Sequence, residues 1–124
     1  MNTAAARANH LERRFISFAA AIVSLSSKLP GTPQGRHICG QMLRSGTSAA
    51  ANYGEARGAE SRADFIHKLK IGFNETTIWL EAIAESSLLP PQNIVAIVAE
   101  SRELCRIIAA SIKTARAPAN DGPP

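Results

Sequence analysis

Hydrophobic residues recur every three or four positions along most of this chain, which is the spacing of one face of an α-helix. Four stretches of similar length show the pattern, near residues 5–28, 33–56, 60–88 and 91–116. No segment alternates hydrophobic and polar residues over more than a few positions, as a half-buried strand would. Helices of equal length joined by short connections favour an all-α, up-down-up-down antiparallel four-helix bundle.

The recurring positions also predict which side chains form the core, because each helix buries one stripe against its neighbours. In the first stretch they are Leu11, Phe15, Phe18, Ile22, Leu25 and Leu29. In the third they are Ile66, Leu69, Phe73, Thr76, Leu80 and Ile83. In the fourth they are Ile94, Ile97, Val98, Ser101, Leu104, Cys105, Ile108 and Ile112.

Turn and capping residues agree with these helix limits. Thr32 is placed to cap the second helix, with Pro33 in its first turn, where a missing N–H does no harm. Ser61 and Asp64 resemble a capping box at the start of the third helix. Residues 117–124 are Ala, Asn, Asp, Gly and Pro only, so we predict one domain over 1–116 and a disordered tail over 117–124.

The second helix contains a run of small residues from Ser45 to Ala51, including Gly46. Gly46, Thr47 and Ser48 lower helix propensity, and small side chains let another backbone approach closely. Two interpretations stay open: the helix is the most buried one of a monomer, or this face forms a subunit interface, which we favour. A polar row on the same helix would then supply hydrogen bonds across the interface; its members are His37, Gln41, Arg44, Ser48, Asn52 and Glu55.

The candidate chemistry is sparse, and we predict neither an enzyme nor a cofactor. The histidines His10, His37 and His67 lie outside any nucleophile or phosphate-loop motif. Asp64 and His67 have the i, i+3 spacing of a di-iron helix motif, but no second copy exists, so no metal site is predicted.

Three glutamates of the third helix have predicted partners rather than predicted chemistry. Glu75 lies among apolar residues and is expected to join Arg44 or Asn52 in a buried network. Glu81 and Glu85 are expected to lie on a solvated face, with bridges to arginines of the fourth helix.

Charge is unevenly distributed along the chain. Residues 1–70 hold ten Lys and Arg against four Asp and Glu, whereas residues 71–124 hold four against six. Basic side chains neutralise phosphates without reading sequence, so nonspecific nucleic-acid binding is one hypothesis. The alternative is a structural or protein-binding scaffold whose positive charge only maintains solubility. The residues that we expect to contact RNA or DNA phosphates are Arg13, Arg14, Arg57, Arg62 and Lys68.

Cellular location is constrained by two observations. Residues 15–25 are uncharged, but 11 residues fall short of the roughly 20 that a bilayer crossing needs. Two cysteines are too few for a disulfide scaffold. We therefore predict a cytoplasmic protein with reduced thiols and no membrane partner.

Several motifs together resemble the bacterial four helix bundle protein family, whose members were first noticed as products of intervening sequences in large-subunit ribosomal RNA genes. The motifs are Gln41-Met-Leu-Arg-Ser-Gly-Thr-Ser48, Ala51-Asn-Tyr-Gly-Glu-Ala56, Glu60-Ser-Arg-Ala-Asp-Phe-Ile-His-Lys68 and Trp79-Leu80-Glu81. The chain departs from the family pattern between Ile71 and Trp79, where the segment is shorter and less charged. That departure leaves open the register of the second half of the third helix.

The resemblance implies a bundle that assembles into a homopentamer. A group related to this family, the accessory variability proteins of diversity-generating retroelements, consists of similar basic pentamers that bind nucleic acid and a reverse transcriptase. Carried onto this chain, the resemblance implies a packing and assembly role for the positions of the family motif and for the neighbouring small residues. These positions are Arg44, Gly46, Ser48, Asn52, Glu55, Ser61, Asp64 and Phe65.

Overall fold

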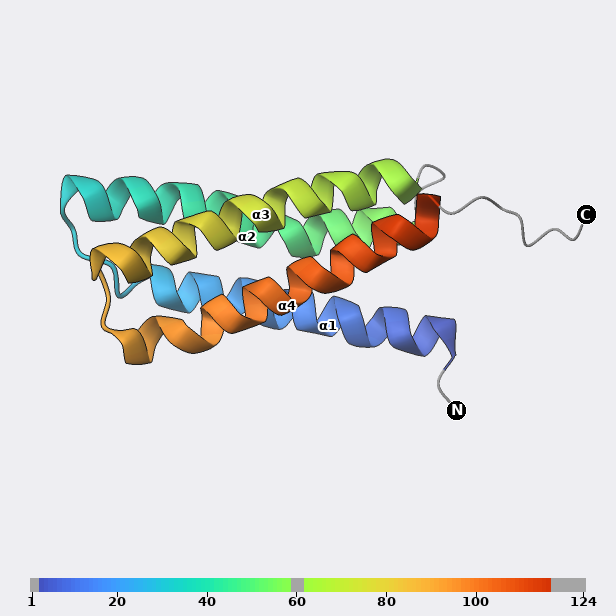
Figure 1. Cartoon of the computed structure of the whole chain (residues 1–124), viewed down its shortest axis with the longest axis horizontal. Helices are drawn as coiled ribbons and strands as arrows, with labels where there is room; N and C mark the ends of the chain where they lie inside the picture. The colour runs from blue at the N-terminus through green and yellow to red at the C-terminus, as the bar shows by residue number, and fades with distance from the viewer. Residues whose placement is uncertain (1–2, 59–61, 117–124) are drawn as a thin grey trace, which may run out of the picture.

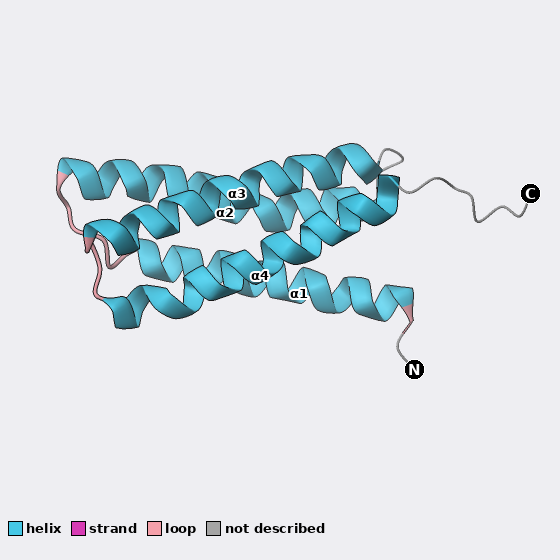
Figure 2. Cartoon of the chain, in the orientation of Figure 1, coloured by secondary structure: helices cyan, strands magenta, loops and turns pink. Residues whose placement is uncertain are grey.

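The computed structural model describes residues 3–58 and 62–116 and arranges them as four antiparallel helices (Figure 1). The helices are α1 (Ala4–Ser26), α2 (Pro33–Gly58), α3 (Arg62–Ser86) and α4 (Pro91–Arg116). Helices that are adjacent in sequence pack against each other, whereas α1 and α4 share a much smaller contact. Figure 2 shows that helix accounts for almost all of the described chain. The predicted all-α up-down bundle is confirmed, and each helix ends within two residues of its expected limit.

The starts of α1 and α2 follow from their capping residues. Thr3 Oγ1 accepts a hydrogen bond from the Ala6 N–H at 3.0 Å, and Thr32 Oγ1 accepts one from the Gly35 N–H at 3.1 Å. Each bond satisfies one of the backbone donors that the first turn of a helix leaves unpaired. The predicted cap at Thr32 is therefore confirmed, with Pro33 as the first helical residue.

α3 ends in a Schellman turn formed by a serine. Ser87 has a positive φ of 58°, its N–H bonds to the Ala84 carbonyl, and the Leu88 N–H bonds back to the Ile83 carbonyl at 3.2 Å. Glycine normally fills this left-handed position, because a Cβ is disfavoured there. Pro90 follows the turn, and α4 begins at Pro91.

Aromatic side chains form the centre of the core. Phe15 is fully buried, and its ring centroid lies 4.7 Å from that of Tyr53 on α2 and 5.3 Å from that of Phe73 on α3. Phe18 lies 5.2 Å from Phe73. The stripe predicted for the third helix is buried in full, from Ile66 to Ile83.

Two pairs of hydroxyl groups cross this core at adjacent positions of α3. Thr76 Oγ1 is hydrogen-bonded to Ser45 Oγ of α2 at 2.8 Å, and Thr77 Oγ1 to Ser101 Oγ of α4 at 2.6 Å. Thr76 and Ser101 are fully buried, and no buried side-chain nitrogen or oxygen of the described residues lacks a partner. Because a buried polar group without a partner is costly, these pairs fix the register of α3 against both neighbours. They resolve the register that the sequence left open between Ile71 and Trp79.

Candidate nucleic-acid interface

The helix charges separate along the bundle axis. Figure 1 shows that α1 begins, α4 ends and α2 meets α3 at the same end of the molecule. Counted from the sequence, the eleven residues of each helix nearest that end hold ten Lys and Arg against three Asp and Glu. The eleven nearest the opposite end hold one against three. We call the end of the bundle where α1 begins the basic end. Three of its ten basic residues come from α4: Arg106, Lys113 and Arg116.

The structure places the predicted phosphate contacts unequally. Arg13 is exposed on α1 and makes no ion pair with any described residue. Its neighbour Arg14 is half-buried and binds Glu100 of α4 through two hydrogen bonds, Nη2 to Oε1 at 2.8 Å and Nε to Oε2 at 3.2 Å. Lys68 is exposed but already engaged with another group. A bidentate pair engages the Arg14 guanidinium within the protomer, and its role as a phosphate contact stays a prediction.

Arg57 and Arg62 lie in the last turn of α2 and the first turn of α3, on either side of the connection at the basic end. Their side chains lie outside what the structure describes, as does the side chain of Phe65. Ser61, and with it the predicted capping box, falls in the gap between the described ranges, and the predicted tail over 117–124 lies beyond them.

The family-motif residues of α2 form a polar cluster with α3. Arg44 Nη2 donates to Glu75 Oε2 at 2.6 Å and to Gln41 Oε1 at 2.8 Å, and Trp79 Nε1 donates to the same Glu75 oxygen at 3.3 Å. The His37 ring meets the Trp79 ring edge-on, with centroids 6.0 Å apart. The predicted pairing of Arg44 with Glu75 is confirmed. The prediction that this network is buried is wrong, since 61% of the Arg44 side chain is exposed.

The remaining motif residues lie at other positions along α2 and α3. Ser48 is half-buried, and its hydroxyl donates to the Ser45 carbonyl of its own helix at 3.0 Å. Asn52 is half-buried, whereas Glu55 and Asp64 are exposed. Gly46 is buried against α1: a Cβ at this position would meet both Cγ atoms of Ile22 at 3.0 Å. The close approach at Gly46 is therefore to α1 of the same chain. At this position the structure favours the interpretation that α2 is a buried helix within one bundle over the interpretation that the small-residue run forms a subunit interface.

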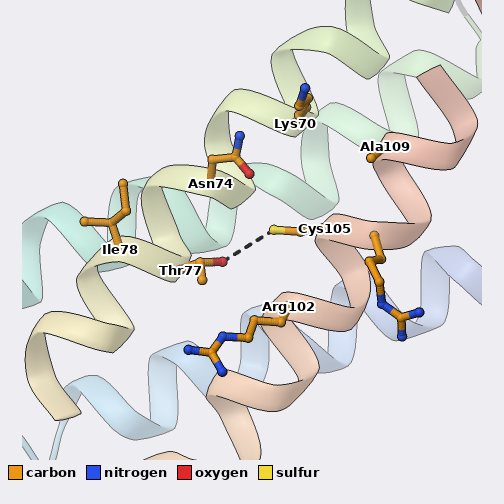
Figure 3. Close-up of a pocket in the computed structure, with 8 residues that line it drawn as sticks. Lys70, Asn74, Thr77, Ile78, Arg102, Cys105 and Ala109 are labelled. Atoms are coloured by element: carbon orange, nitrogen blue, oxygen red, sulfur yellow. Dashed lines mark hydrogen bonds between the residues drawn. The ribbon is translucent and has the colours of Figure 1, made fainter. Parts of the chain in front are cut away.

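A groove of about 550 Å³ runs between the outer sides of α3 and α4 (Figure 3). Basic and polar residues lie along it, with Lys70, Asn74 and Ile78 on α3 and Arg102, Arg106 and Ala109 on α4. At its floor, Thr77 Oγ1 and Cys105 Sγ point toward each other at 3.4 Å. Burial raises the pKa of the Cys105 thiol above its ordinary value of 9.0, and the hydrogen bond with Thr77 offsets part of that increase.

The sequence did not reveal this groove, although it predicted one of the ion pairs beside it. Arg102 Nε donates to Glu81 Oε1 at 2.9 Å, as expected for a bridge between Glu81 and an arginine of the fourth helix. Arg106 pairs with Glu103 one turn earlier on its own helix. Lys70 makes no ion pair with a described residue. Ile78 lies on the α3 side of the groove and is exposed. It falls outside the core stripe that the periodicity predicts for the third helix, so a large aliphatic residue at this position is the sequence signal for the groove.

The described residues contain no group of three or more His, Cys, Asp or Glu side chains that could hold a metal ion. Across residues 3–58 and 62–116, no helix combines the length and apolar character that a bilayer crossing requires.

The order of the four helices and the packing of each against its neighbour in sequence define an all-α, up-down four-helix bundle protein. Residues 9–110 match the 23S rRNA-intervening sequence protein family, and the chain belongs to that family. Among solved structures, it is similar to a protein of unknown function from the S23 ribosomal protein family of Bacteroides thetaiotaomicron. The two are 34% identical with a TM-score of 0.74, over 83% of this chain and 98% of that one. A comparison with curated proteins gives no match.

Proposed function

We propose that this protein is a non-enzymatic, cytoplasmic accessory factor that binds RNA or DNA phosphates at its basic end without reading sequence. The observation that carries the proposal is the excess of Lys and Arg there, ten against three acidic residues, contributed by all four helices. Phosphate contacts of this kind release counterions, so affinity rests on charge and falls as salt rises. Base stacking is not part of the proposal, because Phe15, Phe18 and Phe73 are buried in the core.

A salt series with a charge-reversal pair tests this function. Duplex and single-stranded oligonucleotides are titrated with the wild type and with Arg57→Glu/Arg62→Glu, which reverses two charges at the basic end. The matched control is Lys28→Glu/Arg36→Glu, which makes the same change in net charge at the opposite end. We expect tight binding at low salt that weakens steeply with salt, with at least a tenfold loss in the first variant and little change in the control. Absence of binding at low salt, or equal losses in both variants, would contradict the proposal.

We further propose that the protein is a homo-oligomer, with five subunits as the number that its family resemblance implies. The face over α1 and α2 supports self-association. Ile16 and Val23 are exposed there, and α1 carries no charge from Phe15 to Ser27. Helical spacing places Leu43 and Ala50 of α2 on the same face as Gly46, which packs against Ile22 of α1. An oligomer would repeat the basic end around its axis and raise affinity for a long polyanion by multivalency.

A second candidate function is a scaffold that binds proteins rather than nucleic acid. The exposed aliphatic side chains Ile71, Ile78 and Val95 favour it, since phosphate binding does not need them. By family analogy a reverse transcriptase is one such partner. The salt titration separates the two functions, because a scaffold would bind no oligonucleotide at low salt.

A further inference from the structure

The groove between α3 and α4 combines features that nucleic-acid binding at the basic end does not explain. Its floor is formed by the side chains of Thr77 and Cys105, with Ala109 and Ile78 beside them. Ile78 is 62% exposed, although large aliphatic side chains usually lie inside a bundle. Phosphate backbones gain little from contact with methyl groups, whereas protein segments gain a great deal.

The charged residues that line the groove are all basic. Lys70 lies on the α3 side, and Arg102 and Arg106 lie four residues apart on the α4 side. The acidic partners of the two arginines, Glu81 and Glu103, are not among the lining residues. The two arginines are largely exposed and the two glutamates are partly exposed; pairs of this kind contribute little stability, so an incoming carboxylate can replace either partner.

The length of the groove matches a short helix. From Lys70 to Ile78 on α3 there are eight residues, or about 12 Å at the helical rise of 1.5 Å per residue. A helix that presents apolar side chains at positions i, i+4 and i+7 spans about 10.5 Å. Carboxylates four residues apart on that helix would match the spacing of Arg102 and Arg106.

We propose that the groove between α3 and α4 is a docking site for an acidic amphipathic helix of a partner protein. The apolar side of that helix would cover Thr77, Cys105 and Ala109, and its Asp or Glu side chains would pair with Lys70, Arg102 and Arg106. This site is separate from the proposed nucleic-acid function, although Lys70 and Arg106 also belong to the basic end. Variants that are expected to change either peptide binding or oligonucleotide binding, but not both, therefore distinguish the two sites.

The probe is a fluorescein-labelled, end-capped helical peptide with Leu at i, i+4 and i+7 and Glu on both sides of the Leu row. Two control peptides replace every Glu by Lys, or every Leu by Ser. Binding is measured by fluorescence anisotropy with the full chain. We expect a dissociation constant on the order of 10–100 μM for the acidic peptide and at least tenfold weaker binding of both controls.

Two variants of the groove are compared with two matched variants elsewhere. Ala109→Trp fills the groove at an exposed position of α4, and its control is Ala96→Trp, exposed on the same helix and outside the groove. Lys70→Glu reverses a groove charge, and its control is Lys28→Glu at the opposite end of the bundle. We expect each groove variant to weaken peptide binding at least tenfold and each control to leave it within twofold. Ala109→Trp should leave oligonucleotide binding unchanged, and Arg57→Glu/Arg62→Glu should leave peptide binding unchanged.

Several results would overturn the docking proposal. These are no peptide binding at 1 mM, equal binding to Ala109→Trp and the wild type, or preference for the Lys peptide. If Ala109→Trp weakens oligonucleotide binding instead, the groove belongs to the nucleic-acid surface. If it lowers the solution mass by light scattering, a second copy of this chain covers the groove. Each of these outcomes leaves the salt titration of the basic end as an independent result.

Discussion

The hydroxyl of Thr76 on α3 lies 2.8 Å from the hydroxyl of Ser45 on α2, and both side chains are buried. Thr76 Oγ1 is also 2.9 Å from the Gly72 carbonyl of its own helix, so the pair joins the α2–α3 seam to the α3 backbone. The next residue, Thr77, makes the equivalent bond to Ser101 of α4. Adjacent threonines therefore connect α3 to both helices that pack against it.

We expect Thr76→Val to lower the free energy of unfolding by about 1–2 kcal/mol. The change keeps the shape of the side chain but leaves Ser45 Oγ with only the distant Met42 carbonyl, 3.4 Å away. Urea denaturation followed by circular dichroism measures the effect. The double variant Thr76→Val/Ser45→Ala removes both groups and should cost less than the two single changes together. Additive costs would mean that the two hydroxyls do not depend on each other.

Two glycines of α2 should respond to alanine with opposite signs. A Cβ at Gly46 would meet Ile22 at 3.0 Å, so Gly46→Ala should reduce the free energy of unfolding by about 1–3 kcal/mol through overpacking. A Cβ at Gly40 has open space around it, so Gly40→Ala should raise the free energy by about 0.5–1 kcal/mol. Thermal melting of the two variants gives the comparison. If both changes were stabilising, α1 and α2 would be less tightly packed at Gly46 than the structure has them.

Position 87 should prefer glycine. Ser87 adopts a left-handed conformation with φ of 58°, which disfavours any residue that has a Cβ. We expect Ser87→Gly to raise the free energy of unfolding by about 0.5–1 kcal/mol. Ser27, at the end of α1, is a matched control because its φ is −71°, so Ser27→Gly should bring no gain. Equal effects at the two positions, measured by thermal melting, would argue against strain at Ser87.

The core of this bundle was predictable because it depends only on spacing along one helix at a time. Phe15, Phe73 and Ile108 were placed correctly by their steps of three and four residues. Partners across helices were predictable where the register was right, as for Glu81 with Arg102.

Other features depend on the lateral fit between helices, which spacing does not contain. Ser45 was assigned to a small-residue run, and its buried partner Thr76 lies 31 residues away in the chain. The pairing of Arg14 with Glu100, which lies 86 residues away in the chain, could not be predicted from spacing either. The groove along Ile78 exists only because the outer sides of α3 and α4 leave space between them.

The thiol of Cys105 should react slowly in the folded protein. Its pKa is raised by burial, so less thiolate is present at pH 8 than in an exposed cysteine. In a Cys39→Ser background, which leaves Cys105 as the one thiol of the chain, we expect a disulfide reagent to modify Cys105 much faster in urea than in buffer. Rapid modification of the folded protein would contradict a raised pKa for this half-buried thiol.

The same pKa has a consequence for stability. Above pH 9.0 the unfolded chain loses the Cys105 proton while the folded chain keeps it, so the folded state binds more protons. The free energy of unfolding should therefore fall as pH rises through 9.0. Cys105→Ala should show a smaller fall over the same range, and the difference between the two proteins isolates the thiol from other groups. Identical pH profiles would mean that the Cys105 pKa is the same in both states.

Self-association should depend on the uncharged face over α1 and α2. If that face is the subunit interface, the wild type should have a solution mass several times the 13.2 kDa of one chain by light scattering. Val23→Glu places an unpaired charge in the interface, where desolvating it is costly, and should reduce the mass. Val95→Glu is the matched control, because Val95 is an exposed valine on α4, away from this face. A monomeric wild type would refute self-association, and an unchanged mass for Val23→Glu would place the interface on another face.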